Sequence, residues 1–117
     1  MARSPSSAIA VKRPLFNAFI TALTAGVIAA QAADDKVKTG ARLYQDNCES
    51  CHGEDLHNNS GVTFDLRRLR ADEHDRFVNS VLNGKNAMPA WRGALDTREI
   101  EQLWGYIRAN AYDAAAN

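Results

Sequence analysis

Hydrophobic residues recur with helical spacing near the end of the chain. The positions i, i+3, i+4 and i+7 of an amphipathic helix are occupied by Ile100, Leu103, Trp104 and Ile107. Asp96 and Glu99 precede this run with the spacing of a capping box, which satisfies the first free N–H groups of a helix. The pattern therefore predicts a helix that begins after Asp96 and buries one face.

Two earlier segments carry weaker helical patterns. Residues 35–47 place apolar side chains at Val37, Ala41, Leu43 and Tyr44. Residues 72–83 place them at Phe77, Val78, Val81 and Leu82. Asp72 is the expected N-cap of the second segment, and Asn83-Gly84 is the expected end. The chain is therefore predicted to be all-α.

Glycines in the first and last predicted helices indicate how the two helices pack. Gly40 and Gly105 are small enough to permit a close crossing, around which Tyr44 and either Trp104 or Tyr106 would pack. Such a crossing brings the two ends of the folded chain together.

The segment from Gly53 to Ala71 is polar and contains the turn sequence Asn58-Asn59-Ser60-Gly61. We expect a loop here, and loops of this length are usually functional. It offers apolar side chains that could line a cofactor: Leu56, Val62, Phe64, Leu66 and Leu69. The cluster Arg67, Arg68 and Arg70 is expected to be a solvated charge run rather than a ligand site. Residues 112–117 are expected to be a frayed tail.

The first thirty residues have the pattern of an export signal. Basic residues without acids precede the apolar run Leu15–Ala30, and Ala30-Gln31-Ala32 offers small residues to a signal peptidase. We expect residues 1–32 to be cleaved and residues 33–117 to form one domain. A retained membrane anchor is the alternative, because the run is close to the ~17 residues that can span a bilayer.

Length and charge narrow the class of protein. The predicted mature part has 85 residues, so its core is small and a covalently held cofactor would stabilise it. Three of the 14 basic residues and none of the 14 acidic residues lie in residues 1–32. Residues 33–117 therefore carry 11 basic and 14 acidic residues, a net charge of −3. That charge argues against a nucleic-acid partner.

The candidate chemistry lies in Cys48-Glu49-Ser50-Cys51-His52. Two thiols three positions apart followed by an imidazole form the attachment sequence of a c-type haem, in which His52 binds the iron. Export fits this reading, because haem attachment to cysteine takes place where oxidised thiols are handled, in a bacterial periplasm. A disulfide, a redox-active dithiol and a zinc site with His57 as fourth ligand are the alternatives.

Met88 is the candidate for the second axial ligand. It is followed by Pro89 in a loop of small and polar residues, where burial on a helix does not explain a methionine. A thioether sulfur suits the sixth position of haem iron, and Pro89 would stiffen the loop that presents it. His57 and His74 are minor alternatives for this ligand.

Together these features resemble the class I cytochromes c over essentially the whole predicted mature chain. The residues that carry the resemblance are Cys48–Gly53, Met88-Pro89 and Leu103–Ile107. It implies an all-α cytochrome c fold with three main helices and long loops around one covalently bound haem. It also implies that Trp91 donates its indole N–H to a haem propionate. The chain lacks the proline that follows the attachment motif in many members and whose carbonyl orients the proximal histidine.

The resemblance implies a periplasmic one-electron carrier rather than an enzyme. Redox proteins would be its partners, and the Ala87–Trp91 segment is similar to small cytochromes that accept electrons from quinoprotein alcohol dehydrogenases. An oxidase or another cytochrome would be the acceptor, and no membrane insertion is expected after cleavage. The alternative is a haem protein that binds or senses ligands at an open sixth position.

Overall fold

The computed structural model describes residues 24–116. Within this range the chain forms four α-helices and no named β-strand. The helices are α1 (Thr24–Asn47), α2 (Glu49–His52), α3 (His74–Asn83) and α4 (Thr97–Ala109). Short 3₁₀ helices lie at Glu54–Leu56, Leu66–Arg68, Ala71–Glu73 and Ala114–Ala116. The predicted all-α fold with three main helices is confirmed, with α2 as a short addition.

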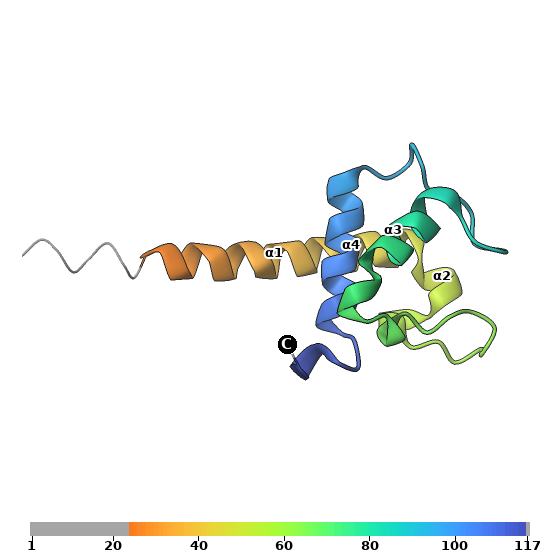
Figure 1. Ribbon diagram of the computed structural model, residues 1–117, viewed down its shortest axis with the longest axis horizontal. Coiled ribbons are helices and arrows are strands. Elements are labelled where there is room, and N and C mark those ends of the chain that lie inside the picture. Colours follow the sequence, from red (N-terminus) through yellow and green to blue (C-terminus); the bar gives the residue numbers. More distant parts are fainter. Residues whose placement is uncertain (1–23, 117) are drawn as a thin grey trace, which may run out of the picture.

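Helix α1 begins eleven residues before the predicted start at residue 35 and continues through the predicted cleavage point. Figure 1 shows its first half extending away from the rest of the molecule. Side chains 29–36 are exposed along this part. Residues 1–23, which contain most of the predicted export signal, lie outside the described residues. Within residues 24–116, no helix has the length and apolarity needed to cross a membrane.

Figure 1 shows helices α1 and α4 crossing. The crossing lies at Gly40, as the sequence predicted. A Cβ at this glycine would lie 2.9 Å from the Cβ of Tyr106 and still closer to the backbone of Gln102. The rings of Tyr44 and Tyr106 pack beside the crossing, with centroids 5.4 Å apart. Gly105 also faces α1 but is not the point of backbone contact, because the nearest atoms to a Cβ there would be those of the Lys36 side chain.

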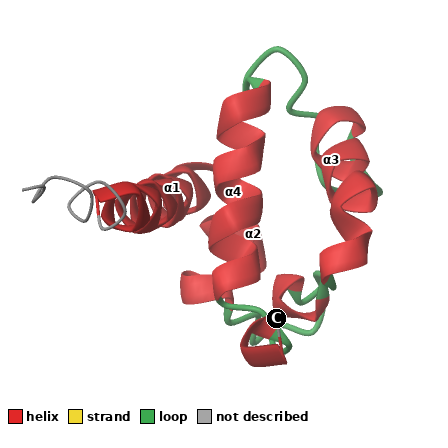
Figure 2. Ribbon diagram, turned by 60° about the vertical axis from the view of Figure 1, so that its left-hand side comes forward, coloured by secondary structure: helices red, strands yellow, loops and turns green. Residues whose placement is uncertain are grey.

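Trp104 packs against α3 rather than at the α1–α4 crossing. Its ring lies 5.2 Å from that of Phe77 and 5.3 Å from that of His74. Nε2 of His74 also lies 2.6 Å from a carboxylate oxygen of Glu101 on α4. Trp104 therefore fixes α3 beside α4, and Figure 2 shows these two helices joined at one end by their connecting loop.

The helix caps agree only in part with the sequence. The Asp96–Glu99 capping box is confirmed, with both reciprocal hydrogen bonds at 2.8 Å. Asp72 does not cap α3, because a 3₁₀ turn at Ala71–Glu73 precedes this helix. The Asp72 carboxylate instead accepts a hydrogen bond from Nε of Arg70 at 3.0 Å.

The first residues of the predicted frayed tail are held by hydrogen bonds. The backbone N–H of Tyr112 donates to the carbonyl of Arg67 at 3.0 Å. Nη1 of Arg108 lies 2.7 Å from the carboxylate of Asp113. The first bond fastens the tail to the loop that precedes α3, and the second fastens it to α4.

Candidate functional site

A cavity of about 670 Å³ opens between α3, α4, the loop after α2 and the loop between α3 and α4. This volume lies within the ~300–1,000 Å³ typical of ligand sites. Its lining is mostly apolar, and it includes the side chains singled out from the sequence: Cys48, Cys51, His52, Met88 and Trp91. Residues far apart in the chain therefore converge on one space.

The two cysteines lie at the junction of α1 and α2. The N–H of Cys48 donates to the carbonyl of Tyr44 at 2.8 Å, and the N–H of His52 donates to the carbonyl of Cys48 at 2.9 Å. Both thiols are free, with Cys48 half-buried and Cys51 exposed. Burial, with a smaller contribution from the Cys51 thiolate, raises the pKa of Cys48 to about 11. Cys48 is therefore a neutral thiol near pH 7.

His52 is oriented by a backbone carbonyl. Its Nδ1 lies 3.3 Å from the carbonyl oxygen of Phe64, which can only accept, so Nδ1 donates and Nε2 is left free as a ligand atom. Burial lowers the pKa of His52, and the bond to Phe64 opposes that shift. This acceptor could not be predicted from the sequence, because every residue has a main-chain carbonyl oxygen.

Side-chain hydrogen bonds hold the loop 58–64 against α2. The hydroxyl of Thr63 donates to the carbonyl of Cys51 at 2.9 Å. The Asn58 amide in turn donates to the Thr63 hydroxyl at 2.6 Å and to the Thr63 carbonyl. Phe64 follows directly, so this network fixes the carbonyl that orients His52.

A tight turn after α3 presents Met88. The N–H of Lys85 donates to the carbonyl of Met88, and the N–H of Met88 donates to the carbonyl of Lys85, both at 3.0 Å. Gly84 has φ of 74°, and a Cβ there would lie 2.7 Å from the Met88 carbonyl oxygen. The close return of the chain therefore requires glycine at this position. The N–H of Trp91 donates to the carbonyl of Val81 at 2.9 Å and fixes the loop to α3.

Tyr44 forms part of the cavity wall and was not predicted to do so. Its side chain is fully buried, and its hydroxyl donates to the carbonyl of Gly53 at 2.5 Å. Burial raises the pKa of Tyr44 well above its ordinary value. The bond ties α1 to the residue that follows the Cys48–His52 segment.

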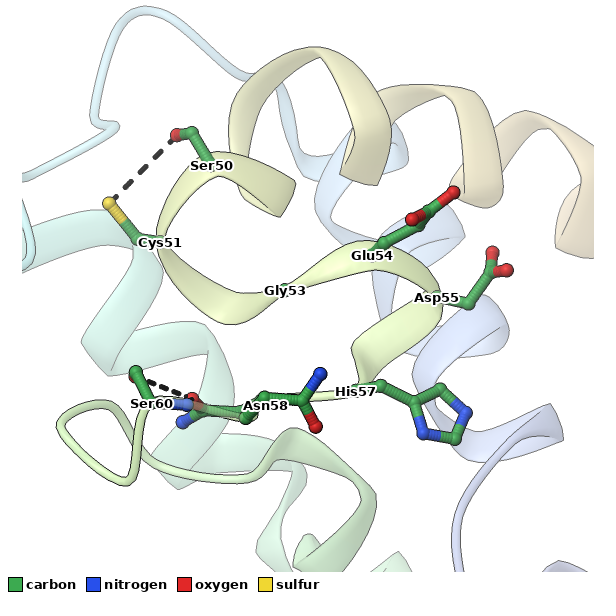
Figure 3. Close-up of a pocket in the computed structure, with 9 residues that line it drawn as sticks. Ser50, Cys51, Gly53, Glu54, Asp55, His57, Asn58 and Ser60 are labelled. Carbon is green, nitrogen blue, oxygen red and sulfur yellow. Dashed lines mark hydrogen bonds between the residues drawn. The ribbon is translucent and has the colours of Figure 1, made fainter.

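The other histidines and the arginine cluster lie outside the cavity. His57 lines a separate polar depression with Glu54 and Asp55, shown in Figure 3. Its Nδ1 accepts a hydrogen bond from Nη1 of Arg67 at 3.0 Å. His74 contacts Trp104 and Glu101, as described above. Neither histidine lines the cavity that contains Met88.

The donor set of the cavity fits a haem. The walls are mostly apolar, include no carboxylate from residues 24–116, and carry two thiols, an imidazole and a thioether. Among the lining residues of the loop after α2 are Val62, Phe64, Leu66 and Leu69, whereas Leu56 is buried in the core instead. The zinc alternative fails, because no group of three metal-binding His, Cys, Asp or Glu side chains occurs in residues 24–116.

Comparison with known proteins agrees with this geometry. The family model described as cytochrome C oxidase, cbb3-type, subunit III matches residues 35–107. The chain is 32% identical over 98 residues to cytochrome c-555 of Methylococcus capsulatus, covering 79% of this chain and 80% of that protein. It is 33% identical over 102 residues to the chloroplastic cytochrome c6 of Chlamydomonas reinhardtii, covering 80% of this chain and 66% of that protein.

A segment of a much larger protein is similar as well. The chain is 32% identical over 80 residues to the quinohemoprotein alcohol dehydrogenase ADH-IIG of Pseudomonas putida. The match covers 66% of this chain but only 11% of the dehydrogenase. No solved structure matches the chain.

Proposed function

The chain belongs to the class I cytochromes c, and from this premise we propose that it is a periplasmic one-electron carrier with His52 and Met88 as axial ligands of its iron. As a cytochrome c it is an electron carrier with haem c, and not an enzyme. The proposal adds the attachment of that haem through Cys48 and Cys51.

The convergence of two proposed attachment thiols and two proposed axial ligands on one mostly apolar cavity supports this assignment most directly. Cys48, Cys51 and His52 enter from α1 and α2, whereas Met88 enters from the turn after α3. These elements are separated by the loop 53–73, yet their side chains line the same space. A methionine that only filled the core would not need the constrained Gly84 turn that presents it.

The chain's own residues account for tight ligation. A haem with two axial protein ligands supplies one-electron exchange between ferric and ferrous iron, and methionine favours the ferrous state. The Phe64 carbonyl fixes the ring of His52, and the paired bonds between Lys85 and Met88 fix the turn. The apolar walls exclude water. A site held in this way changes little between oxidation states.

The proposed location and partners rest on separate observations. Side chains 29–36 are exposed, so the predicted cleavage point after Ala32 lies in an accessible part of the chain. Similarity to part of a quinohemoprotein alcohol dehydrogenase supports a quinoprotein alcohol dehydrogenase as donor. The oxidase name of the matching family model supports an oxidase or another cytochrome as acceptor.

Spectroscopy of the purified protein tests the proposal. We expect a pyridine haemochrome spectrum of the c type, a sulfur-to-iron charge-transfer band in the oxidised protein, and little binding of carbon monoxide by the reduced protein. Rapid carbon monoxide binding with no charge-transfer band would instead show an open sixth position, as in a haem-based sensor. A colourless protein with Cys48 joined to Cys51 would contradict haem attachment.

A further inference from the structure

The charges that line the haem cavity have one sign. Among its lining residues only Arg76 and Lys85 are charged, and both are cations. Both side chains are exposed, so their charge lies at the mouth of the cavity rather than within it. A partner that approaches this mouth therefore meets positive groups first.

The same sign extends from within α3 into the loop that follows it. Residues 76–95 contain Arg76, Lys85 and Arg92 but no acidic residue, whereas residues 33–117 as a whole have a net charge of −3. Arg92 follows the cavity residue Trp91, and its Nη2 donates to the Asn83 side chain at 2.9 Å. We call Arg76, Lys85 and Arg92 the basic strip.

Two of the three cations have no acidic partner among residues 24–116. Arg76 lies 2.6 Å from a carboxylate oxygen of Glu73, which partly neutralises it. Lys85 and Arg92 form no ion pair within the part of the chain that the structure describes. The free charge of the basic strip is therefore concentrated beside the Met88 turn.

Acidic groups lie around a different hollow. Glu54 and Asp55 line the polar depression beyond α2, and Figure 3 shows their carboxylates there, away from the Cys51 thiol. Two carboxylates thus lie beyond the cysteines, whereas Lys85 and Arg92 lie beside the methionine.

Exposed apolar side chains complete the mouth of the cavity. Val62 is 86% exposed and Phe64 is 42% exposed, and both line the cavity. The guanidinium of Arg76 lies 5.0 Å from the centre of the Phe64 ring, which joins the apolar surface to the basic strip. Ala87 and Pro89 are exposed on the Met88 side. An apolar centre with a charged margin is the usual composition of a protein interface.

We propose that this face docks a redox partner that presents an acidic surface, although the net charge of the mature chain would repel one. The proposal rests on the electron-carrier function above and adds the sign of the partner's charge. Complementary charge at the margin would steer a brief encounter, as suits electron transfer.

Small oxidants of opposite charge test the sign of the face. The reduced holoprotein is mixed in stopped flow with anionic hexacyanoferrate(III) or with the cationic tris(phenanthroline)cobalt(III) complex. Ionic strength is raised from about 0.01 M to about 0.1 M, which shortens the screening length from about 30 Å to about 10 Å. We expect the rate with hexacyanoferrate(III) to fall by about twofold or more and the rate with the cobalt complex to rise. Because this measurement includes the carboxylates of the bound haem, it reports the charge that a partner meets.

A charge-matched pair of variants locates the effect. The double variant Lys85→Gln/Arg92→Gln removes two charges from the basic strip, and we expect it to slow hexacyanoferrate(III) about two- to tenfold at low salt. The control Lys38→Gln/Arg42→Gln removes two exposed charges from α1, outside the cavity, and should change the rate by less than about twofold.

The outcomes separate this inference from the proposed function. Suppose that the protein binds haem and has a reversible couple. A rate with hexacyanoferrate(III) that rises with salt, or an equal response of the two double variants, then overturns the acidic-partner proposal alone. A protein without haem or without a reversible couple overturns the carrier function and this inference with it.

Discussion

Gly40 of α1 lies directly against the main chain of Gln102 of α4, so that the two helices touch through backbone atoms at this point. The rings of Tyr44 and Tyr106 pack beside the contact. This crossing sets the position of the end of α1, and Cys48 follows that end directly. The geometry of haem attachment therefore depends on a glycine eight residues earlier.

Gly40→Ala should force the helices apart. Its Cβ would meet the backbone of Gln102, which cannot move aside, and overpacking of this kind costs about 1–3 kcal/mol. Gly105→Ala is the matched control. The nearest atoms to its Cβ would belong to the flexible side chain of Lys36, which can shift, and the helix would gain up to about 1 kcal/mol. Urea denaturation of both variants measures the difference, and equal stability would contradict the described crossing.

Tyr44→Phe tests the buried hydrogen bond to Gly53. The substitution keeps the ring but leaves the Gly53 carbonyl without the hydroxyl, which should cost about 1–3 kcal/mol of unfolding free energy. Tyr112→Phe removes a hydroxyl that bonds Asp65 on an exposed side chain, and its effect should be about 0.5 kcal/mol or less. Chemical denaturation compares the two, and a smaller loss at Tyr44 than at Tyr112 would refute the assignment.

Met88→Ala should open the sixth coordination position. We expect the sulfur-to-iron band to disappear, carbon monoxide to bind, and the reduction potential to fall, because the thioether favours ferrous iron. Leu95→Ala also removes an apolar side chain that lines the cavity, at a cost of about 2–5 kcal/mol, but should keep the band. Retention of the band in Met88→Ala would identify another ligand.

Loss of both thiols should make the haem removable. In Cys48→Ser/Cys51→Ser no thioether bond can form, so acidified organic solvent should extract any bound haem. Ser50→Ala leaves both cysteines in place and should retain it. Absorbance of the extracted and protein phases reports the result, and extraction of the haem from the unmodified protein would disprove covalent attachment.

Asp65→Asn should lower the free energy of unfolding by an amount that depends on pH. Hydrogen bonds from the Arg67 side chain, at 3.0 and 3.1 Å, lower the pKa of Asp65, and smaller contributions come from the Arg67 backbone and from Tyr112. The charged carboxylate is therefore favoured in the folded state. Its contribution, about 0.5–1 kcal/mol, is complete above the unfolded-state pKa near ~4. It is lost as the pH falls through the lower folded-state pKa.

Urea midpoints at about pH 7 and about pH 2 test this sign. Asp65→Asn should be less stable than the unmodified protein at the higher pH and should approach it at the lower one. Asp46→Asn, an exposed position without an ion pair among residues 24–116, should show little difference at either pH. A deficit in Asp65→Asn that grows in acid would contradict the lowered pKa.

Side-chain patterns predicted the parts of the fold that depend on side chains. The capping box at Asp96, the apolar face of α4 and the crossing at Gly40 all follow from residue type and spacing. The convergence of the Cys48–His52 segment with Met88 was expected from ligand chemistry, and the structure places both at one cavity.

The remaining features depend on backbone atoms and long-range contacts, which the sequence does not display. The Phe64 carbonyl carries no signature in its side chain. Trp104 has the spacing of a residue facing α1. At the crossing, however, Tyr106 packs against Tyr44, and Trp104 contacts Phe77 instead. Tyr112 and Asp113 are held because the main-chain carbonyl of the distant Arg67 and the side chain of Arg108 bond to them.

Phe64 serves the site through two chemically separate groups. Its carbonyl oxygen orients His52, whereas its ring lies exposed beneath the guanidinium of Arg76. Any amino acid supplies the same main-chain oxygen. A substitution at position 64 can therefore alter the surface offered to a redox partner while the oxygen that orients His52 stays in place.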